Sequence, residues 1–140
     1  MNKVKIKKML QRLLCSVFFS LVFISAYSQE NVEIPSEISM ALKSGDAAQL
    51  SNYLNDNVEM VILDKEGIYN KNQAEVILND FFKKNPPRRF SLLHQGGKTK
   101  SKYGIGNLET ADETFRVYFL LKETNGKQII HQLRIEKENG

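Results

Sequence analysis

The feature that most constrains this chain is its division into a helical first half and a second half patterned almost entirely as strands. From Arg89 onward, apolar and polar residues alternate with a period of two, which is typical of half-buried strands. Pro86 and Pro87 stand at the boundary, and proline cannot continue a helix. Helices gathered first and strands afterwards predict an α+β fold, in which helices cover one face of a sheet.

Four strands are expected after the two prolines. Asn125-Gly126 is the strongest hairpin signal, because both central positions of a tight primed turn need positive φ. The apolar rows of the four strands are Phe90, Leu92 and His94; Tyr103, Ile105 and Leu108; Phe115, Val117, Phe119 and Leu121; and Ile129, His131, Leu133 and Ile135.

The first half predicts three helices and one short strand. The first helix follows Pro35, and Gly45-Asp46 ends it and starts a second, whose buried face is Leu50, Tyr53 and Leu54. We expect a turn at 55–57, a strand at 58–63 and a polar turn at 64–67. The third helix is expected from about Lys71 to Lys84, with an apolar stripe of Ala74, Ile77, Leu78, Phe81 and Phe82.

The first 28 residues have the pattern of a cleaved secretion signal. Five basic residues precede an apolar run from Leu13 to Ala26, and no acidic residue comes before Glu30. Fourteen residues of helix span roughly 21 Å, short of the roughly 30 Å that a membrane anchor must cross. Ala26-Tyr27-Ser28 places the cut before Gln29. We therefore expect an exported protein, periplasmic or extracellular, with one domain at 29–140 and no membrane anchor after cleavage.

Removal of this signal changes what the composition implies. The single cysteine, Cys15, leaves with it, so no disulfide, thiolate metal site or cysteine nucleophile remains. The formal charge of +4 falls to about −1, with 15 basic and 16 acidic side chains. A near-neutral domain has no overall field to attract nucleic acid or a membrane surface, and nucleic acid is disfavoured further because export removes it as a partner.

Three segments together resemble the nuclear-transport-factor-2-like (NTF2-like) superfamily, which includes SnoaL-like and ketosteroid-isomerase-like proteins. They are ALKSGDAAQLSNYLNDNVEM, QAEVILNDFFKKNPP and YGIGNLETADETFRVYFLLKETNGKQIIHQLRIEKE. The resemblance is to a small secreted bacterial branch of unknown function. It implies a cone fold, a curved antiparallel sheet wrapped around N-terminal helices with a cavity at its open end. The superfamily holds enzymes and binding modules alike, so it assigns no chemistry.

Polar residues in apolar rows are the candidates for lining such a cavity. A histidine there could serve as a general base or ligand donor, and a tyrosine could hydrogen-bond a ligand. The alternatives are a core or rim histidine satisfied by a backbone carbonyl, and tyrosines that bury only their rings. The pocket candidates are His94, His131, Tyr53, Tyr69 and Tyr103.

Acidic residues are missing from the expected inward rows. Isomerase-like members of the superfamily use an aspartate general base with a tyrosine and a protonated acid, whereas Glu109, Asp112 and Glu113 fall here at a turn, and Asp46 fits a helix cap. We therefore name no catalytic residue, metal site or cofactor. The pattern favours a non-catalytic ligand-binding or accessory module for a small apolar or anionic ligand. The alternative is an isomerase-like or hydrolase-like enzyme that uses a cavity histidine with a tyrosine.

A basic run lies between Asp80 and Glu109. Interleaved with Phe90 and Tyr103, it could bind nucleic acid, an anionic glycan or a lipid head group. The alternative is a solvated helix end followed by a lysine-rich hairpin, since cations suit a helix C-terminus and lysine guards strand edges. The run consists of Lys83, Lys84, Arg88, Arg89, Lys98, Lys100 and Lys102.

The outer face of the last two strands mixes arginine, tyrosine and aliphatic residues, as the centre of a non-obligate interface does. An apolar strip there would otherwise stay exposed, so we expect a homodimer through this face, with Arg116 and Arg134 toward the rim. Contact with a different protein and a simple amphipathic monomer are the alternatives. The interface candidates are Arg116, Tyr118, Leu120, Ile130, Gln132 and Arg134.

Overall fold

The structure, a computed structural model, describes residues 2–20 and 33–139. The predicted cleavage site before Gln29 lies outside the described residues. No helix of the described residues is long and apolar enough to cross a membrane. The elements are α1 (Lys3–Ser20), α2 (Ser36–Ser44), α3 (Ala47–Ser51), β1 (Leu54–Ile62), β2 (Lys65–Asn70), α4 (Lys71–Lys84), β3 (Pro87–Lys98), β4 (Ser101–Thr110), β5 (Thr114–Thr124) and β6 (Lys127–Lys137).

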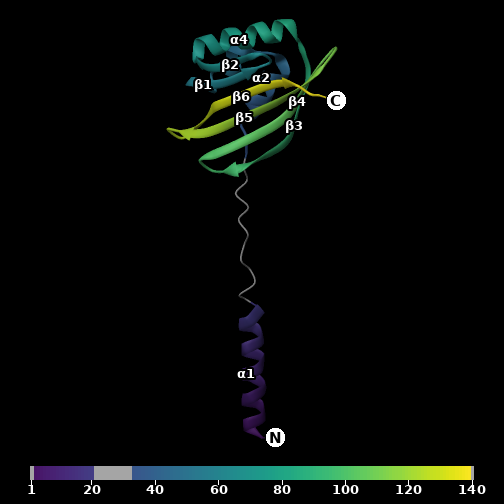
Figure 1. The fold of residues 1–140 in the computed structure, drawn as a ribbon. Helices are drawn as coiled ribbons and strands as arrows, with labels where there is room; N and C mark the ends of the chain where they lie inside the picture. Colours follow the sequence, from purple (N-terminus) through teal and green to yellow (C-terminus); the bar gives the residue numbers. More distant parts are fainter. Residues whose placement is uncertain (1, 21–32, 140) are drawn as a thin grey trace.

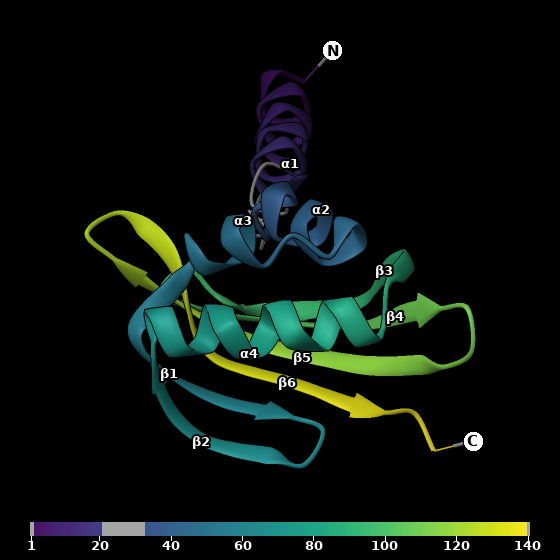
Figure 2. The same cartoon turned by 90° about the horizontal axis from the view of Figure 1, so that it is seen from above.

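The six strands form one sheet in the order β2-β1-β6-β5-β4-β3. Every neighbouring pair is antiparallel except β1 and β6, which are parallel, so the sheet is mixed. The sheet curves around α2, α3 and α4, while α1 lies apart from them (Figure 1, Figure 2). This is the expected α+β architecture, with one parallel pair where an antiparallel sheet was predicted.

Local signals in the sequence set the helix boundaries. Gly45 ends α2 with φ 65° and donates its amide hydrogen to the last turn. Asp46 then caps α3, accepting from the Gln49 amide at 2.9 Å. Asn70 and Gln73 form a reciprocal capping box at the start of α4, and Pro86 follows its end. The prediction of a helix from Lys71 to Lys84 is confirmed.

The core lies between the three helices and the inner face of the sheet. Phe115 and Phe119 are fully buried, and the Phe81 ring meets Phe115 edge to face with centroids 5.1 Å apart. In the described part of the chain, all core residues fall between Ile34 and Ile135, so α1 contributes nothing to this core. The domain therefore has its own hydrophobic core.

Glycines take two inward positions of β4 because aromatic rings fill their space. A Cβ atom on Gly104 would lie 2.7 Å from Cε2 of Phe119, and one on Gly106 would lie 2.6 Å from Cζ of Phe90. The inward row of β4 is thus Gly104, Gly106 and Leu108. Tyr103 and Ile105 consequently lie on the outer face of the sheet, not in the inward row with Leu108.

Two elements differ from the prediction. Lys65 to Asn70 form the edge strand β2 where a polar turn at 64–67 was expected. Its side chains are mostly exposed, so the apolar alternation that marks a strand is weak here. The second helix ends at Ser51, and Leu54 already belongs to β1. The expected turn at 55–57 is instead an irregular part of β1, opposite a break in its register with β6.

Two β-bulges move both histidines out of their predicted rows. On β3, Leu92 pairs with Gly106 and His94 with Ile105, so Leu93 is an extra residue and His94 turns to the outer face. On β6, Ile130 pairs with Leu121 and Gln132 with Leu120, which makes His131 the extra residue. The predictions that each histidine shares an inward row with its strand's apolar residues are therefore wrong.

The bulge at His131 also reverses the residues before it. Ile130 pairs with the buried Leu121 and is itself 0% exposed, so it belongs to the core. Its predicted place on the outer face is wrong, because a shift of one residue moves a side chain to the opposite face of a sheet. Ile129 takes the outer position beside Lys122.

Candidate functional site

The structure does not gather the five predicted pocket residues in one place. His94 is exposed and, like Tyr103, lies on the outer face. Tyr69 packs against the core from β2, and Tyr53 lies between α3 and β1, where its carbonyl oxygen accepts from the Ile130 amide. His131 occupies the β6 bulge. Ligand binding by these residues stays a prediction.

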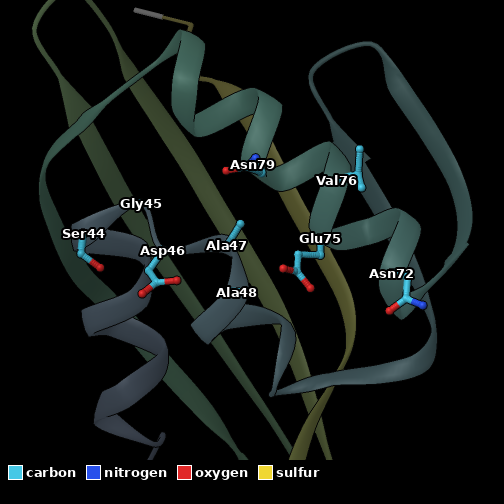
Figure 3. A pocket seen from close by; sticks show the side chains of 9 residues that line it. All are labelled: Ser44, Gly45, Asp46, Ala47, Ala48, Asn72, Glu75, Val76 and Asn79. Carbon is cyan, nitrogen blue, oxygen red and sulfur yellow. The ribbon is translucent and has the colours of Figure 1, made fainter.

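One groove lies between α2, α3 and α4. Its volume is about 670 Å³, and the carboxylates of Asp46 and Glu75 stand on its two sides (Figure 3). Asp46 already caps α3. The lining residues are Ser44, Gly45, Asp46, Ala47, Ala48, Asn72, Glu75, Val76 and Asn79.

A second groove of about 570 Å³ includes one of the predicted pocket residues, Tyr53. Gln128 also lines it, and the Gln128 Oε1 atom is buried without a hydrogen-bond partner among the described residues. A buried acceptor of this kind would favour a ligand with a hydrogen-bond donor. The other lining residues are Pro35, Glu37, Gln49, Asn52, Lys127 and Ile129.

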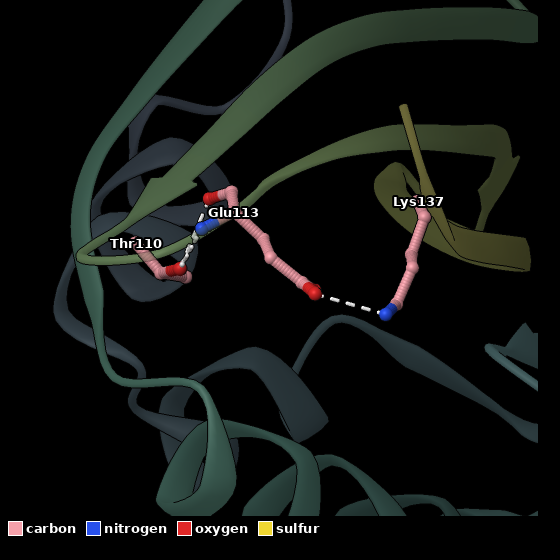
Figure 4. A network of polar contacts seen from close by, with 3 residues as sticks. All are labelled: Thr110, Glu113 and Lys137. Atoms are coloured by element: carbon pink, nitrogen blue, oxygen red, sulfur yellow. Dashed lines mark hydrogen bonds and ion pairs between the residues drawn. The ribbon is translucent and has the colours of Figure 1, made fainter. Parts of the chain in front are cut away.

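Glu113, at the β4–β5 turn, serves local structure. Glu113 donates its amide hydrogen to Oγ1 of Thr110 at 3.1 Å, and Thr110 Oγ1 donates to the Glu113 carbonyl oxygen at 2.9 Å. The Glu113 carboxylate pairs with Lys137 at 2.9 Å (Figure 4). Within the described ranges, no group of three or more His, Cys, Asp or Glu side chains could hold a metal ion.

Neither histidine has the partner that a general base needs. Among the described residues, neither imidazole has a hydrogen-bond partner, and the Nε2 atom of His131 is buried. Burial first, and then the nearby Lys122 ammonium, lower the pKa of His131 below its ordinary value. His131 is therefore neutral at physiological pH, in a positively charged setting.

We expect an NMR titration of the His131 ring protons to report a pKa below the ordinary value of about 6.5. As the pH falls, the unfolded chain then binds a proton at His131 before the folded protein does. The contribution of His131 to the free energy of unfolding is therefore fully present above about pH 6.5. The contribution is lost as the pH falls from there toward the folded pKa. Lys122→Gln should raise the pKa, since it removes a like charge.

Lys65→Gln is the matched control, because Lys65 is an exposed lysine on the distant strand β2. The control should leave the His131 pKa unchanged. A pKa of His131 that rises equally in both variants, or does not rise in Lys122→Gln, would contradict the assignment of the shift to Lys122.

The outer face of the sheet carries a compact apolar block that α2, α3 and α4 leave uncovered. Tyr103 pairs with Leu120, and Ile105 pairs with Tyr118, so the four side chains adjoin on β4 and β5. We call these four residues the outer block. Tyr118 and Leu120 were predicted from the alternation of β5, whereas Tyr103 and Ile105 were placed elsewhere. The three helices instead bury most of their apolar residues in the core.

Paired polar side chains border the outer block on its β6 side. Gln132 lies beside Leu120 and donates to Glu59 Oε2 at 2.8 Å. Arg134 lies beside Tyr118 and pairs with Glu136 at 3.1 Å, and this contact raises the pKa of the Arg134 guanidinium. An apolar centre with a hydrogen-bonded polar border is the usual anatomy of a protein interface.

The arrangement of helices inside a curved six-stranded sheet is the NTF2-like fold. A protein of the NTF2-like family from Streptomyces avermitilis shares it with a TM-score of 0.55 at 7% identity, over 75% of this chain and 91% of that one. At this identity the likeness shows the fold alone.

Closer relatives identify the family. Residues 35–136 match the family described as "Domain of unknown function (DUF4783)", and the chain belongs to it. A DUF4783 protein from Bacteroides ovatus is 36% identical over 78% of this chain and 99% of its own, with a TM-score of 0.73. Another from Bacteroides uniformis is 33% identical over 77% and 100%, also with a TM-score of 0.73. No curated protein matches the chain.

Proposed function

We propose that this protein is an exported, non-catalytic accessory module that acts by binding another protein surface through the outer block. Its first partner is a second copy of itself, packed about a two-fold axis. The single observation that supports this proposal is the outer block, in which two tyrosines and two aliphatic residues adjoin on a face that α2, α3 and α4 leave bare.

The charge pattern around the block suits a two-fold contact. Glu59 and Glu136 lie among Arg116 and Arg134 on the same face, so a two-fold axis can bring each arginine near a carboxylate of the partner. Rim charges of this kind set orientation more than affinity. The affinity would come from Tyr118 and Leu120 at the centre.

The inner side of the sheet offers less to an enzyme. Phe115, Phe119 and Leu133 occupy it and are fully buried, and both histidines lie outside the inward rows. Among the described residues, no acidic or basic side chain is buried on this side. These features support a binding role over isomerase-like or hydrolase-like chemistry.

A small-ligand role is the second candidate, and one observation favours it. The groove with Tyr53 also presents Gln128, whose Oε1 atom has no hydrogen-bond partner among the described residues. Native mass spectrometry of the purified domain would reveal a retained ligand. A ligand lost on Gln128→Leu would place it in this groove, whereas a ligand retained by that variant would place it elsewhere.

Sedimentation equilibrium of residues 29–140 tests the self-association. The domain can be studied without α1. The Bacteroides ovatus protein is matched over 99% of its own length by 78% of this chain, which is close to the length of residues 29–140. We expect a dimer at micromolar concentration. A monomer at high micromolar concentration would rule out the homodimer and leave a different protein as the partner of the outer block.

A further inference from the structure

Two separate hairpins bring five lysines to one end of the sheet. On the outer face, Lys98 and Lys122 both pair with Ser101, so their Cα atoms are about 10 Å apart across two strand spacings. Lys100 lies beside Glu123, whose amide donates to the Lys100 carbonyl oxygen. Figure 1 shows the β3–β4 and β5–β6 hairpins at the same end of the sheet. We call Lys98, Lys100, Lys102, Lys122 and Lys127 the lysine end.

Lysines outnumber the acidic residues at the lysine end. The ion pairs of the described residues involve Lys84, Arg89, Arg134 and Lys137, and none involves these five lysines. Glu123 is the one acidic residue within 98–102 and 122–128, which leaves these two segments with a net charge of +4. Glu33, whose carbonyl oxygen accepts from Lys102, and Glu37, which lines a groove with Lys127, reduce this excess to about +2, so a near-neutral domain carries a basic surface here.

Protection of a strand edge does not explain this surface. Lysines often guard exposed edges, and Lys98 at the end of the edge strand β3 fits that role. Lys122 lies on β5, which pairs with β4 on one side and β6 on the other. Its ammonium group therefore guards no edge, and its position calls for another explanation.

The chain enters the domain at the same end. Lys102 Nζ donates to the backbone carbonyl oxygen of Glu33 at 3.3 Å, which fixes the entry point beside the lysines. Six residues lie between Ala26, the last of the predicted apolar run, and Glu33, so the seven Cα-to-Cα steps can span at most about 25 Å. If the predicted apolar run lies in a membrane during export, this short connection would hold the entry point, and the lysine end beside it, close to the lipid head groups.

We propose that the lysine end is a docking surface for an anionic phospholipid membrane. It keeps the domain at the membrane after the signal is removed, by electrostatic attraction alone. The inference goes beyond the dimer and does not depend on it, because the exposed hairpins extend past the outer block. A lysine near an anionic membrane strengthens binding by about fivefold, so four exposed lysines suffice for reversible attachment that salt would weaken.

The test is co-sedimentation of residues 29–140 with vesicles. We expect binding to phosphatidylcholine vesicles that contain about 30% phosphatidylglycerol, none to phosphatidylcholine alone, and release at about 0.5 M salt, where charges are screened. The variant that replaces Lys98, Lys100, Lys122 and Lys127 with glutamine should bind at least about tenfold more weakly.

A matched control removes the same charge from the opposite end. Lys43, Lys65, Lys83 and Arg88 are all exposed and form no ion pair in the described structure. Lys65 and Arg88 lie at the opposite ends of their strands, and Lys43 and Lys83 lie in the last turns of α2 and α4 near Pro87. Replacement of all four with glutamine should change binding by less than about threefold, and circular dichroism should show both variants folded.

Three outcomes would overturn the proposal. The first is no binding to the phosphatidylglycerol vesicles. The second is an equal loss of binding in the two glutamine variants, which would reflect total charge and not the lysine end. The third is binding to dextran sulfate without binding to the vesicles, which would make an anionic polysaccharide the occupant.

Discussion

We expect replacement of Phe119 by alanine to lower the free energy of unfolding by about 3–5 kcal/mol, which is the usual cost of truncating a buried aromatic side chain to alanine. Phe119 is fully buried at the centre of the sheet, and its ring also covers Gly104 on the neighbouring strand. The truncation therefore leaves a cavity, and Gly104 has no side chain that could fill it. Urea denaturation of residues 29–140 measures the change.

The same contact predicts a coupling between the two positions. Gly104→Ala should itself cost about 1–3 kcal/mol, because its Cβ atom would overlap the Phe119 ring. In a Phe119→Leu background the added methyl group has room, so its cost should fall or vanish. Val76→Ala is the control, since Val76 is 68% exposed on α4 and should change stability by less than about 0.5 kcal/mol.

Additive effects of Gly104→Ala and Phe119→Leu would contradict this packing. So would a Phe119→Ala variant as stable as Val76→Ala. Both results would mean that the ring does not lie over Gly104 in solution.

Elements with local signals could be predicted from the sequence. Asp46 caps α3, Asn125-Gly126 makes the hairpin with φ 51° and 76°, and the third helix ends before Pro86. In each case a few neighbouring residues determine the backbone, because the capping or turn geometry involves no distant partner. The superfamily and its fold were predicted from a resemblance of three segments, in which these elements occur in the order that the superfamily has.

The β-bulges could not be predicted, because a bulge depends on the neighbouring strand. Nothing in the sequence around His131 distinguishes a bulge from a continuous row, since Ile129 and Ile130 are equally apolar. One extra residue moved Ile130 into the core and took His131 out of its row. The pocket hypothesis placed both histidines in those rows, and the bulges therefore removed both from it.

The residues of the outer face could be predicted on β5 but not on β4. Alternation on β5 correctly placed Tyr118 and Leu120 there, because their neighbours Phe119 and Leu121 are plainly core residues. On β4 the inward positions are glycines, which show no apolar signal. Tyr103 and Ile105 were therefore assigned to the wrong side, although they complete the outer block.

Tyr118→Ala is expected to weaken self-association by about 2 kcal/mol or more, which is roughly a 30-fold rise in the dimer dissociation constant. Tyr118 lies between Ile105 and Arg134 in the middle of the outer face and is half-buried in the monomer. A two-fold contact would bury the remaining ring surface on both copies at once. Sedimentation equilibrium across a concentration series gives the constant.

Two further variants separate the centre of the contact from its rim. Leu120→Ala should weaken the dimer in the same direction as Tyr118→Ala, whereas Arg116→Ala should cost less than about 1 kcal/mol because exposed rim charges contribute little. The free energy of unfolding of the monomer should barely change in any of them, since none of the three side chains enters the core. If the Tyr118→Ala variant and the wild type had the same dimer dissociation constant, the dimer would use another face. The outer block would then be free for a different protein, and cross-linking through a cysteine at position 118 would identify what covers it.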